Sequence, residues 1–299
     1  MSQPLIKVKN IHKRYAKHLA LDNVSFNINE GRICGLIGEN GAGKTTLIRI
    51  ISGLIKQDSG EIIGLKGCKL SSIVEAPALH LNLSAYDNLH YQLILCGENP
   101  SHEKIEEVLN LVGLADVDPR KKAKDFSLGM RQRLAIGLAI IDSPKLLILD
   151  EPINGLDPKG IKDIRDILAT LKNDFNITIL ISSHILSEIT LLADTVGIID
   201  KGILLEESSM EELNKKNRKY IMLEVSDVSK TTIVLEKEFE VTNYSVEDNN
   251  HIIIYSHGLD LAKINKSLVM SGISVASSQT CNDSLEDYFK KITGGEGIA

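Results

Sequence analysis

A glycine-rich stretch near the start of the chain limits its fold more than any other feature. Residues 38–46 read GENGAGKTT and fit the pattern G-x-x-x-x-G-K-[ST]. The apolar run ICGLIG at 33–38 precedes them and is typical of a strand buried on both faces. The following KTTLIRIISGL predicts a helix that ends at Gly53. Strand, glycine loop and helix together form one α/β unit.

Each residue type in this loop has a physical reason to bind phosphate. Glycines let the backbone curl, so that its N–H groups face the β- and γ-phosphate oxygens. A lysine supplies a mobile positive charge, a threonine hydroxyl suits Mg²⁺, and the helix N-terminus adds partial positive charge. The alternative is a glycine-rich turn with an incidental lysine. We expect nucleotide contacts from Gly38, Asn40, Gly41, Gly43, Lys44, Thr45 and Thr46, with Thr45 also binding the metal.

A second run, LLILDE at 146–151, brings two carboxylates to the end of a predicted strand. Ligands collect at the carboxyl ends of strands in open α/β sheets. Asp150 is expected to hold Mg²⁺ directly or through water. Glu151 is the candidate for polarising an attacking water, because neighbouring strand residues point different ways. The alternative is a solvated Asp-Glu pair that ends a strand.

The order of predicted elements extends this unit into a sheet domain with a helical insertion. Short β-like runs lie at 5–9 and 24–28, and helices capped by Ser84 and Ser101 follow, the second stopped by Gly113. A third helix is predicted from near Ser127 to about Ile141. Strands then alternate with helices, which predicts a parallel sheet covered on both faces. The predicted strands are 145–149, 177–182 and 195–200, and the predicted helices are 158–173 and 185–193.

The pattern changes near residue 215. Beyond it the expected order is β-α-β-β-α-β, which is typical of a small α+β ferredoxin-like domain, followed by a last helix in DSLEDYFKKITGG. The chain is therefore predicted to hold a domain at 1–215 and a C-terminal accessory domain at 216–299. The helical part of the first domain is expected at about 78–142.

Composition narrows the class of protein. The chain has 299 residues, 43% hydrophobic and 25% charged, as in a soluble globular protein. Its net charge of −6 argues against a nucleic-acid partner. The four scattered cysteines form no C-x-x-C pair, which indicates free thiols in a reducing compartment. Residues 1–13 lack the apolar run of a secretory signal, and no uninterrupted apolar stretch reaches the roughly 18 to 20 residues that span a bilayer.

Together the two phosphate-site runs resemble the ATP-binding cassette family, over about residues 3–210. The family signature, usually L-S-G-G-Q with Q-R shortly after, reads here FSLGMRQR at 126–133. NGLD at 154–157 matches the family's D-loop, and His184 matches its switch histidine, a contact to the γ-phosphate. Tyr15 matches the aromatic residue that stacks on adenine. The resemblance implies a P-loop NTPase cassette with a parallel-sheet core, an antiparallel β subdomain and a helical subdomain.

The resemblance also implies a dimer that buries two MgATP between two cassettes. Ser127 and Gly129 of one copy would cap the γ-phosphate bound by the other, with Asp157 at the dimer contact. Ser127 could equally be a plain helix cap, and Asp157 could be one too. The implied protein is an ATPase, with Glu151 and His184 as catalytic residues. It would power a separate integral membrane permease from the cytoplasmic face, as a homodimer or a heterodimer.

Three positions depart from the family pattern. Glu75 stands where the family has a glutamine that reaches Mg²⁺ and water and marks the joint with the membrane subunit. Leu128 and Met130 replace a glycine and a glutamine of the signature, but Ser127 and Gly129 remain. These changes, together with NGLDP and the C-terminal SLEDYFKKITGG, resemble bacterial ATPases of antibiotic-peptide exporters, the bacitracin-resistance and lantibiotic-immunity type. That narrower resemblance implies export of a peptide or antibiotic-like substrate.

Two other functions fit parts of the sequence. A soluble cassette protein of translation or DNA repair would usually carry two cassettes or a long coiled-coil insert, and commonly basic surfaces. This chain has one cassette, no heptad tract and an acidic balance. A weakly hydrolysing dimer clamp is favoured by Glu75, Leu128 and Met130. The presence of both Glu151 and His184 argues against it.

Overall fold

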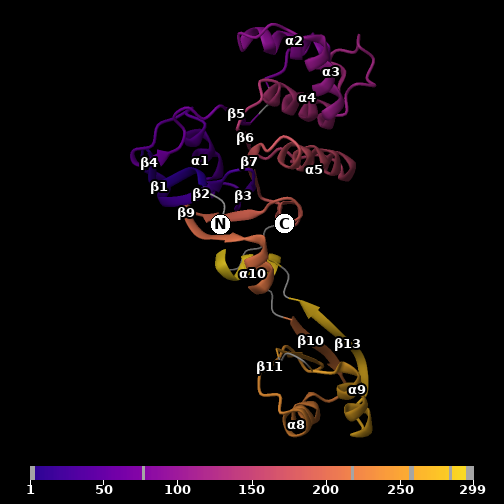
Figure 1. Cartoon of the computed structure of the whole chain (residues 1–299). Helices are drawn as coiled ribbons and strands as arrows, with labels where there is room; N and C mark the ends of the chain where they lie inside the picture. Colours follow the sequence, from indigo (N-terminus) through magenta and orange to yellow (C-terminus); the bar gives the residue numbers. More distant parts are fainter. Residues whose placement is uncertain (1–3, 76–77, 217–218, 256–258, 283–284, 294–299) are drawn as a thin grey trace. The chain divides into compact units, whose positions relative to one another are not determined.

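A computed structural model describes residues 4–75, 78–216, 219–255, 259–282 and 285–293 (Figure 1). The chain divides into two compact units after Met210. The first contains the glycine-rich loop and both predicted carboxylates, and the second contains the β-α-β-β-α-β segment.

The first unit is built on a six-stranded sheet with the order β5-β6-β7-β3-β8-β9. Five of these strands are parallel, and β9 is antiparallel at the edge. β3, β6 and β7 are buried along their whole length, which confirms the parallel-sheet core expected from their continuous apolar runs. The strands are β3 (Ile33–Ile37), β5 (Leu70–Ile73), β6 (Leu146–Leu149), β7 (Thr178–Ser183), β8 (Thr195–Asp200) and β9 (Ile203–Ser209).

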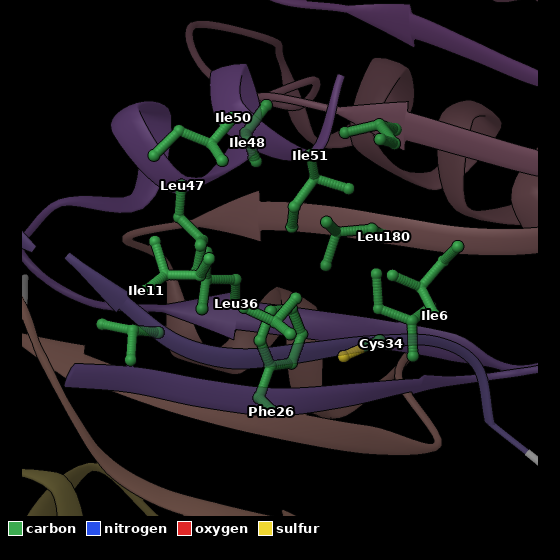
Figure 2. Packing of buried hydrophobic residues seen from close by; sticks show 14 of the residues in the cluster. Ile6, Ile11, Phe26, Cys34, Leu36, Leu47, Ile48, Ile50, Ile51 and Leu180 are labelled. Atoms are coloured by element: carbon green, nitrogen blue, oxygen red, sulfur yellow. The ribbon is translucent and has the colours of Figure 1, made fainter. Parts of the chain in front are cut away.

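A separate antiparallel sheet has the order β2-β1-β4, with β1 (Pro4–Tyr15), β2 (His18–Asn29) and β4 (Ser59–Ile63). One hydrophobic cluster joins the two sheets through helix α1 (Lys44–Ile51) (Figure 2). Phe26 belongs to the antiparallel sheet, Leu36 to the parallel sheet, and Leu47 and Ile51 to α1. Each such side chain contributes about 2 kcal/mol when fully buried. The helix that follows the glycine loop is therefore held on both sides.

Three helices form the insertion: α2 (Ala85–Leu95), α3 (His102–Leu111) and α4 (Leu128–Ile140). Their predicted caps are confirmed. Ser84 and Asp87 form a reciprocal capping box, Ser101 accepts from the N–H of Lys104, and Ser127 accepts from the N–H of Met130. A short 3₁₀ turn at Ala123–Asp125 precedes α4.

The remaining helices of the first unit are α5 (Pro158–Asn173) and α6 (Leu186–Thr190), and α7 (Met210–Lys216) begins at the boundary between the units. α5 matches the predicted range, whereas α6 is shorter than the helix expected at 185–193. Among the residues that the structure describes, no helix is both long and apolar enough to cross a bilayer.

The second unit forms a four-stranded antiparallel sheet with the order β11-β12-β10-β13. This order and the two helices between its strands confirm the ferredoxin-like arrangement. Its core includes Leu223, Leu235, Ile252 and Ile264. The elements are β10 (Lys219–Val225), α8 (Val228–Phe239), β11 (Tyr244–Val246), β12 (His251–Ile254), α9 (Leu261–Met270) and β13 (Val275–Asn282), with α10 (Leu285–Thr293) after them.

The cysteines are free thiols in different environments. Cys34 is buried in β3, Cys96 is exposed, and Cys68 and Cys281 are partly buried. Burial raises the pKa of the Cys34 thiol from 9.0 to about 12. The Cys34 side chain therefore stays a neutral member of the core.

We expect Cys34 to resist thiol reagents until the protein unfolds, while Cys96 reacts first. Above pH 9.0 the unfolded chain loses the Cys34 proton and the folded chain keeps it until about pH 12. This thiol therefore stabilises the folded state fully below pH 9.0, and that contribution falls by about 1.4 kcal/mol per pH unit above it. Urea unfolding at pH 8 to 10.5 measures the effect. Cys34→Val is the control, because its unfolding free energy should lack this part of the pH dependence.

Candidate functional site

The glycine-rich loop connects β3 to α1 under tight steric limits. A Cβ atom at Gly38 would lie 2.2 Å from the carbonyl oxygen of Ile199, and one at Gly43 would lie 2.8 Å from that of Ala20. Gly43 also has φ of 108°, a conformation that favours glycine. The loop therefore packs against its neighbours in a way that side chains at these two positions would prevent.

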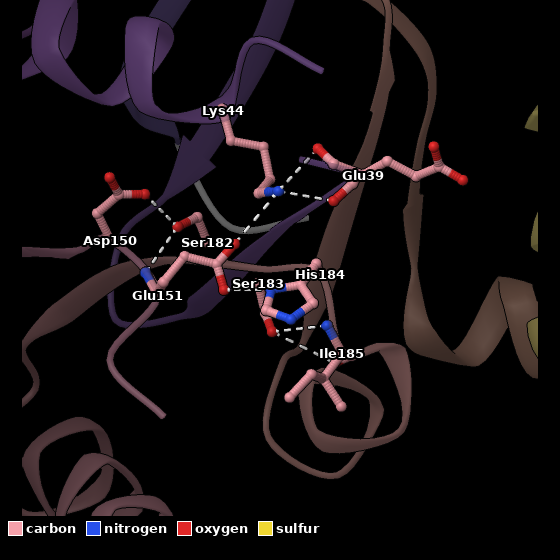
Figure 3. A network of polar contacts seen from close by, with 9 residues as sticks. Glu39, Lys44, Asp150, Glu151, Ser182, Ser183, His184 and Ile185 are labelled. Atoms are coloured by element: carbon pink, nitrogen blue, oxygen red, sulfur yellow. Dashed lines mark hydrogen bonds and ion pairs between the residues drawn. The ribbon is translucent and has the colours of Figure 1, made fainter. Parts of the chain in front are cut away.

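Lys44 extends over this loop and is almost fully buried. Its Nζ donates to the carbonyl oxygens of Gly38 at 2.6 Å and Glu39 at 3.1 Å (Figure 3). The same Nζ lies 3.2 Å from Oε1 of Glu151, after the end of β6. The ammonium group thus bridges the loop and the acidic end of the neighbouring strand.

A hollow of about 270 Å³ opens beside this lysine. Its wall brings together most of the residues predicted to bind nucleotide, and it includes Tyr15 from the end of β1. Tyr15 is 42% exposed, so its ring is accessible. The lining residues are Tyr15, His18, Ala20, Glu39, Asn40, Gly41, Gly43, Lys44, Thr45, Thr46 and Glu151.

One buried hydroxyl links the two acidic residues at the end of β6. Ser182 Oγ donates to Asp150 Oδ1 at 2.6 Å and accepts from the backbone N–H of Glu151 at 2.9 Å. Glu151 Oε2 lies 2.8 Å from His184 Nδ1. Because an ionised carboxylate only accepts, Nδ1 carries the proton of that hydrogen bond. The structure therefore joins Asp150, Glu151 and His184 in one network (Figure 3).

The other oxygen of Glu151 has a different environment. Oε1 is buried, and no group within the described residues donates a hydrogen bond to it. Lys44 lies close enough for ion pairing but is not aligned for a hydrogen bond. A buried carboxylate oxygen without a donor is suited to accept a proton from water.

The signature segment and the D-loop form a second surface. Ser127 is exposed at the start of α4, and a Cβ atom at Gly129 would lie 3.8 Å from Leu156 Cδ2. Asp157 caps α5 by accepting from the N–H of Gly160 at 3.0 Å. Ser127, Gly129 and Asp157 do not line the hollow at the glycine loop. The first unit thus carries two distinct candidate surfaces.

Glu75 lies away from the lining of the hollow. It is 64% exposed, has φ of 66°, and forms an ion pair with Arg49 in the last turn of α1. The Glu75 carboxylate is therefore paired with α1, and it could contact a metal only after the ion pair with Arg49 breaks. The metal-binding role of Glu75 stays a prediction.

Sequence reasoning missed Ser182 as a site residue. The two serines in ITILISSH were a visible signal, but serine at the end of a strand is ordinary. Pairing of Leu149 with Ile181 sets Ser182 next to Asp150 across the parallel ladder. Only this register indicates that the hydroxyl reaches both carboxylate residues.

Comparisons with known proteins agree with this geometry. The profile of the family described as ABC transporter matches residues 21–154. The chain is 44% identical to the bacitracin transport ATP-binding protein BcrA of Bacillus licheniformis, over 98% of this chain and 99% of that protein. It is 47% identical to the lantibiotic transport ATP-binding protein SrtF of Streptococcus pyogenes, over 70% of this chain and 95% of that protein.

Solved structures of ATP-binding cassettes are similar to about seven tenths of the chain. A dimeric post-hydrolysis state of the ATP-binding cassette MJ0796 bound to ADP and Pi has a TM-score of 0.62 at 25% identity, covering 69% of this chain and 98% of that one. The ADP conformation of MJ1267, an ATP-binding cassette of an ABC transporter, has a TM-score of 0.62 at 27% identity, covering 72% and 94%. The cassette fold expected from the motifs is confirmed.

Gly43→Ala should lower the free energy of unfolding more than Gly53→Ala does. Both glycines have positive φ, but nothing lies within 4 Å of a Cβ at Gly53. Gly53→Ala should cost about 1 kcal/mol from backbone strain alone. Gly43→Ala adds the contact with Ala20, for about 1 to 3 kcal/mol more. Urea unfolding without nucleotide measures both, and equal losses would contradict the tight packing of the loop.

Proposed function

We propose, since this chain belongs to the ABC transporter family of ATP-binding proteins, that it binds ATP in the hollow at the glycine loop and hydrolyses it between two cassettes. The main observation behind this proposal is that the hollow and the signature segment lie on separate surfaces. Lys44 and Glu151 line the hollow, whereas Ser127 lies elsewhere. A second copy can therefore supply the signature that one copy does not bring to its own nucleotide.

The hollow would take a nucleoside triphosphate together with its metal. Lys44 would exchange its present carbonyl and Glu151 contacts for the β- and γ-phosphates, and Tyr15 would stack on adenine. The Thr45 hydroxyl and the Asp150 carboxylate are hard oxygen donors of the kind that Mg²⁺ prefers. The metal would neutralise phosphate charge during phosphoryl transfer. The side chains already contain the donors that such a ligand needs.

Glu151 would polarise the attacking water through Oε1. That oxygen is buried, has no hydrogen-bond donor, and faces the positive charge of Lys44 at 3.2 Å. The hydrogen bond from His184 to Oε2 would fix the carboxylate in this orientation. His184 would in addition approach the γ-phosphate.

Ser127, Gly129 and the N-terminus of α4 would cap the γ-phosphate of the second copy. Ser127 is exposed, and the first turn of α4 contains no acidic residue that would repel an anion. Asp157 would lie at the dimer contact while it caps α5. A homodimer supplies both surfaces, and so does a heterodimer with a second cassette.

A separate membrane permease would dock beside the helical insertion. A hollow of about 280 Å³ lies between α2, α4 and the segment around β5, with Leu54, Ile73, Val74 and Leu138 in its wall. Leu54 is 60% exposed, and Leu95 on α2 is 62% exposed. This apolar surface supports a protein partner. The cassette would then work at the cytoplasmic face of the membrane.

The substrate would be a peptide antibiotic, exported from the cell. The names of BcrA and SrtF assign bacitracin and lantibiotic transport to those relatives. The similarity to BcrA extends over nearly the whole chain, including the second unit. The same relatives favour a transporter over a cassette of translation or DNA repair.

Glu151→Gln should lower steady-state ATP hydrolysis by about a hundredfold or more, because an amide does not accept the proton of the attacking water. ATP binding should remain, since Lys44 and Gly43, which would contact the phosphates, are themselves unchanged. Phosphate release measures hydrolysis, and a fluorescent ATP analogue measures binding. Wild-type turnover in this variant would exclude Glu151 as the base.

The same variant tests the substrate class in cells. Cells whose own copy is replaced by Glu151→Gln should become more sensitive to bacitracin or to a lantibiotic, but not to an antibiotic that is not a peptide. Unchanged sensitivity to both peptide antibiotics would overturn the substrate proposal and leave the ATPase proposal intact.

Mixing Lys44→Ala with Gly129→Asp should restore hydrolysis that neither variant shows alone. Gly129 has room for a side chain, so the added carboxylate should repel phosphate without unfolding α4. A mixed dimer then has one site with both defects and one intact site. Random pairing predicts about a quarter of wild-type activity.

The control mixes Lys44→Ala with Glu151→Gln. Both residues line the same hollow, so every site of that mixed dimer is defective and activity should stay low. Equal activity of the two mixtures would contradict a site shared between copies.

A further inference from the structure

We propose that Ser182 is a positioning residue that holds the metal-binding carboxylate and the water-polarising carboxylate as one unit. The inference rests on the roles proposed above for Asp150 and Glu151. It assigns to one hydroxyl the geometry on which both roles depend.

Both directions of the hydrogen bonds at Ser182 are determined by chemistry. The side chain is fully buried in β7, with no exposed surface. A hydroxyl has one proton and two lone pairs. Since the Glu151 backbone N–H only donates and the ionised Asp150 carboxylate only accepts, the proton goes to Asp150 and a lone pair takes the N–H. Rotation of the side chain about χ1, which moves Oγ itself, would break both bonds at once.

The bond to Asp150 selects one carboxylate oxygen for the metal. Oδ1 accepts from Ser182 at 2.6 Å, which leaves Oδ2 to bind a cation. The backbone N–H of Asp150 donates to the carbonyl oxygen of Ile73 at 2.9 Å, so the main chain is held as well. With its hydroxyl partner removed, the carboxylate could rotate and present either oxygen, at a loss of preorganisation.

The bond to Glu151 supports an unfavourable backbone conformation. Glu151 has φ of 50°, in the left-handed region that non-glycine residues rarely adopt. β6 ends at Leu149, so the Glu151 N–H lies beyond the strand and depends on Ser182 as its acceptor. Because the backbone sets the direction of the side chain, this bond also determines where the carboxylate meets His184 and Lys44.

The neighbouring serine has a different role. Ser183 Oγ accepts from the N–H of Ile185 at 2.9 Å, and among the described residues its hydrogen bonds reach neither Asp150 nor Glu151. It shapes the turn into α6, whereas Ser182 joins β6 to β7 at the acidic residues (Figure 3). Both serines are buried at the end of β7, but only Ser182 bonds the acidic residues, so burial alone does not explain these hydrogen bonds.

The test compares Ser182→Thr with Ser182→Val in the full-length chain. The two side chains have nearly the same volume and differ in the hydroxyl group. Val should lower kcat by about tenfold to a hundredfold and raise the Mg²⁺ concentration for half-maximal activity several-fold. KM for ATP at saturating Mg²⁺ should change little. Thr should stay within about threefold of the wild type.

A second measurement follows metal binding in a variant that does not hydrolyse ATP. In a Glu151→Gln background, Mn²⁺ binding in the presence of ATP, followed by electron paramagnetic resonance, should weaken with Val and remain with Thr. Thr231→Val is the control, because it removes another fully buried hydroxyl that donates to a backbone carbonyl in the second unit. It should leave kcat and metal dependence unchanged.

Wild-type kcat and metal dependence in Ser182→Val would overturn the proposal, whatever its unfolding temperature. If Ser182→Thr and Ser182→Val are equally impaired, Ser182→Ala distinguishes the two explanations. Normal activity of Ser182→Ala would mean that side-chain volume caused the loss, and it would overturn the proposal. Impaired activity of Ser182→Ala would support the proposal. Failure of the proposed function would appear differently, as wild-type turnover in Glu151→Gln itself.

Discussion

The parallel pairing of three buried strands is the constraint on which the site depends. β7 lies between β6 and β3, with Leu149 opposite Ile181 and Ile37 opposite Ser183. Parallel strands end at the same edge of a sheet, so the glycine loop, the carboxylates and His184 emerge together. The apolar residues that make these strands buried thereby also bring the polar groups into contact.

Two sheets and one helix hold the glycine-rich loop in its conformation. α1 is anchored by Leu47 and Ile51 in the cluster shared by the parallel and antiparallel sheets. The loop before it has no room for a Cβ at Gly38 or Gly43. A loop held in this way can present its N–H groups to phosphate at little conformational cost on binding. The site is thus preorganised by packing on the far side of the loop.

Polar contacts in the site explain how a few residues can serve phosphoryl transfer. Lys44 is held near Glu151 by its own loop, and Glu151 is held by both His184 and Ser182. Lys44 and Glu151 are thus each held in position by hydrogen bonds from or to neighbouring residues. This arrangement suits a reaction that needs positioning and charge stabilisation more than covalent chemistry.

Local signals made several elements predictable. Ser84, Ser101 and Ser127 cap helices where the sequence placed them, because a cap depends on residues only three positions away. β4 and β5 were missed, because SGEII and LSSI are short and partly polar; β4 is mostly exposed, and β5 is only partly buried. They become strands through their partners, β4 beside β1 and β5 beside β6.

The sequence alone determined the glycine-rich loop between a strand and a helix, the acidic strand end and the ferredoxin-like order of the second unit, because motif spacing and hydrophobic period are local properties. Only the tertiary structure decided that Ser182 joins Asp150 to Glu151, that Arg49 pairs with Glu75, and that Ser127 lies apart from the hollow. Those facts depend on strand register and on which elements pack together. Residues distant in the sequence set both, so no short motif contains them.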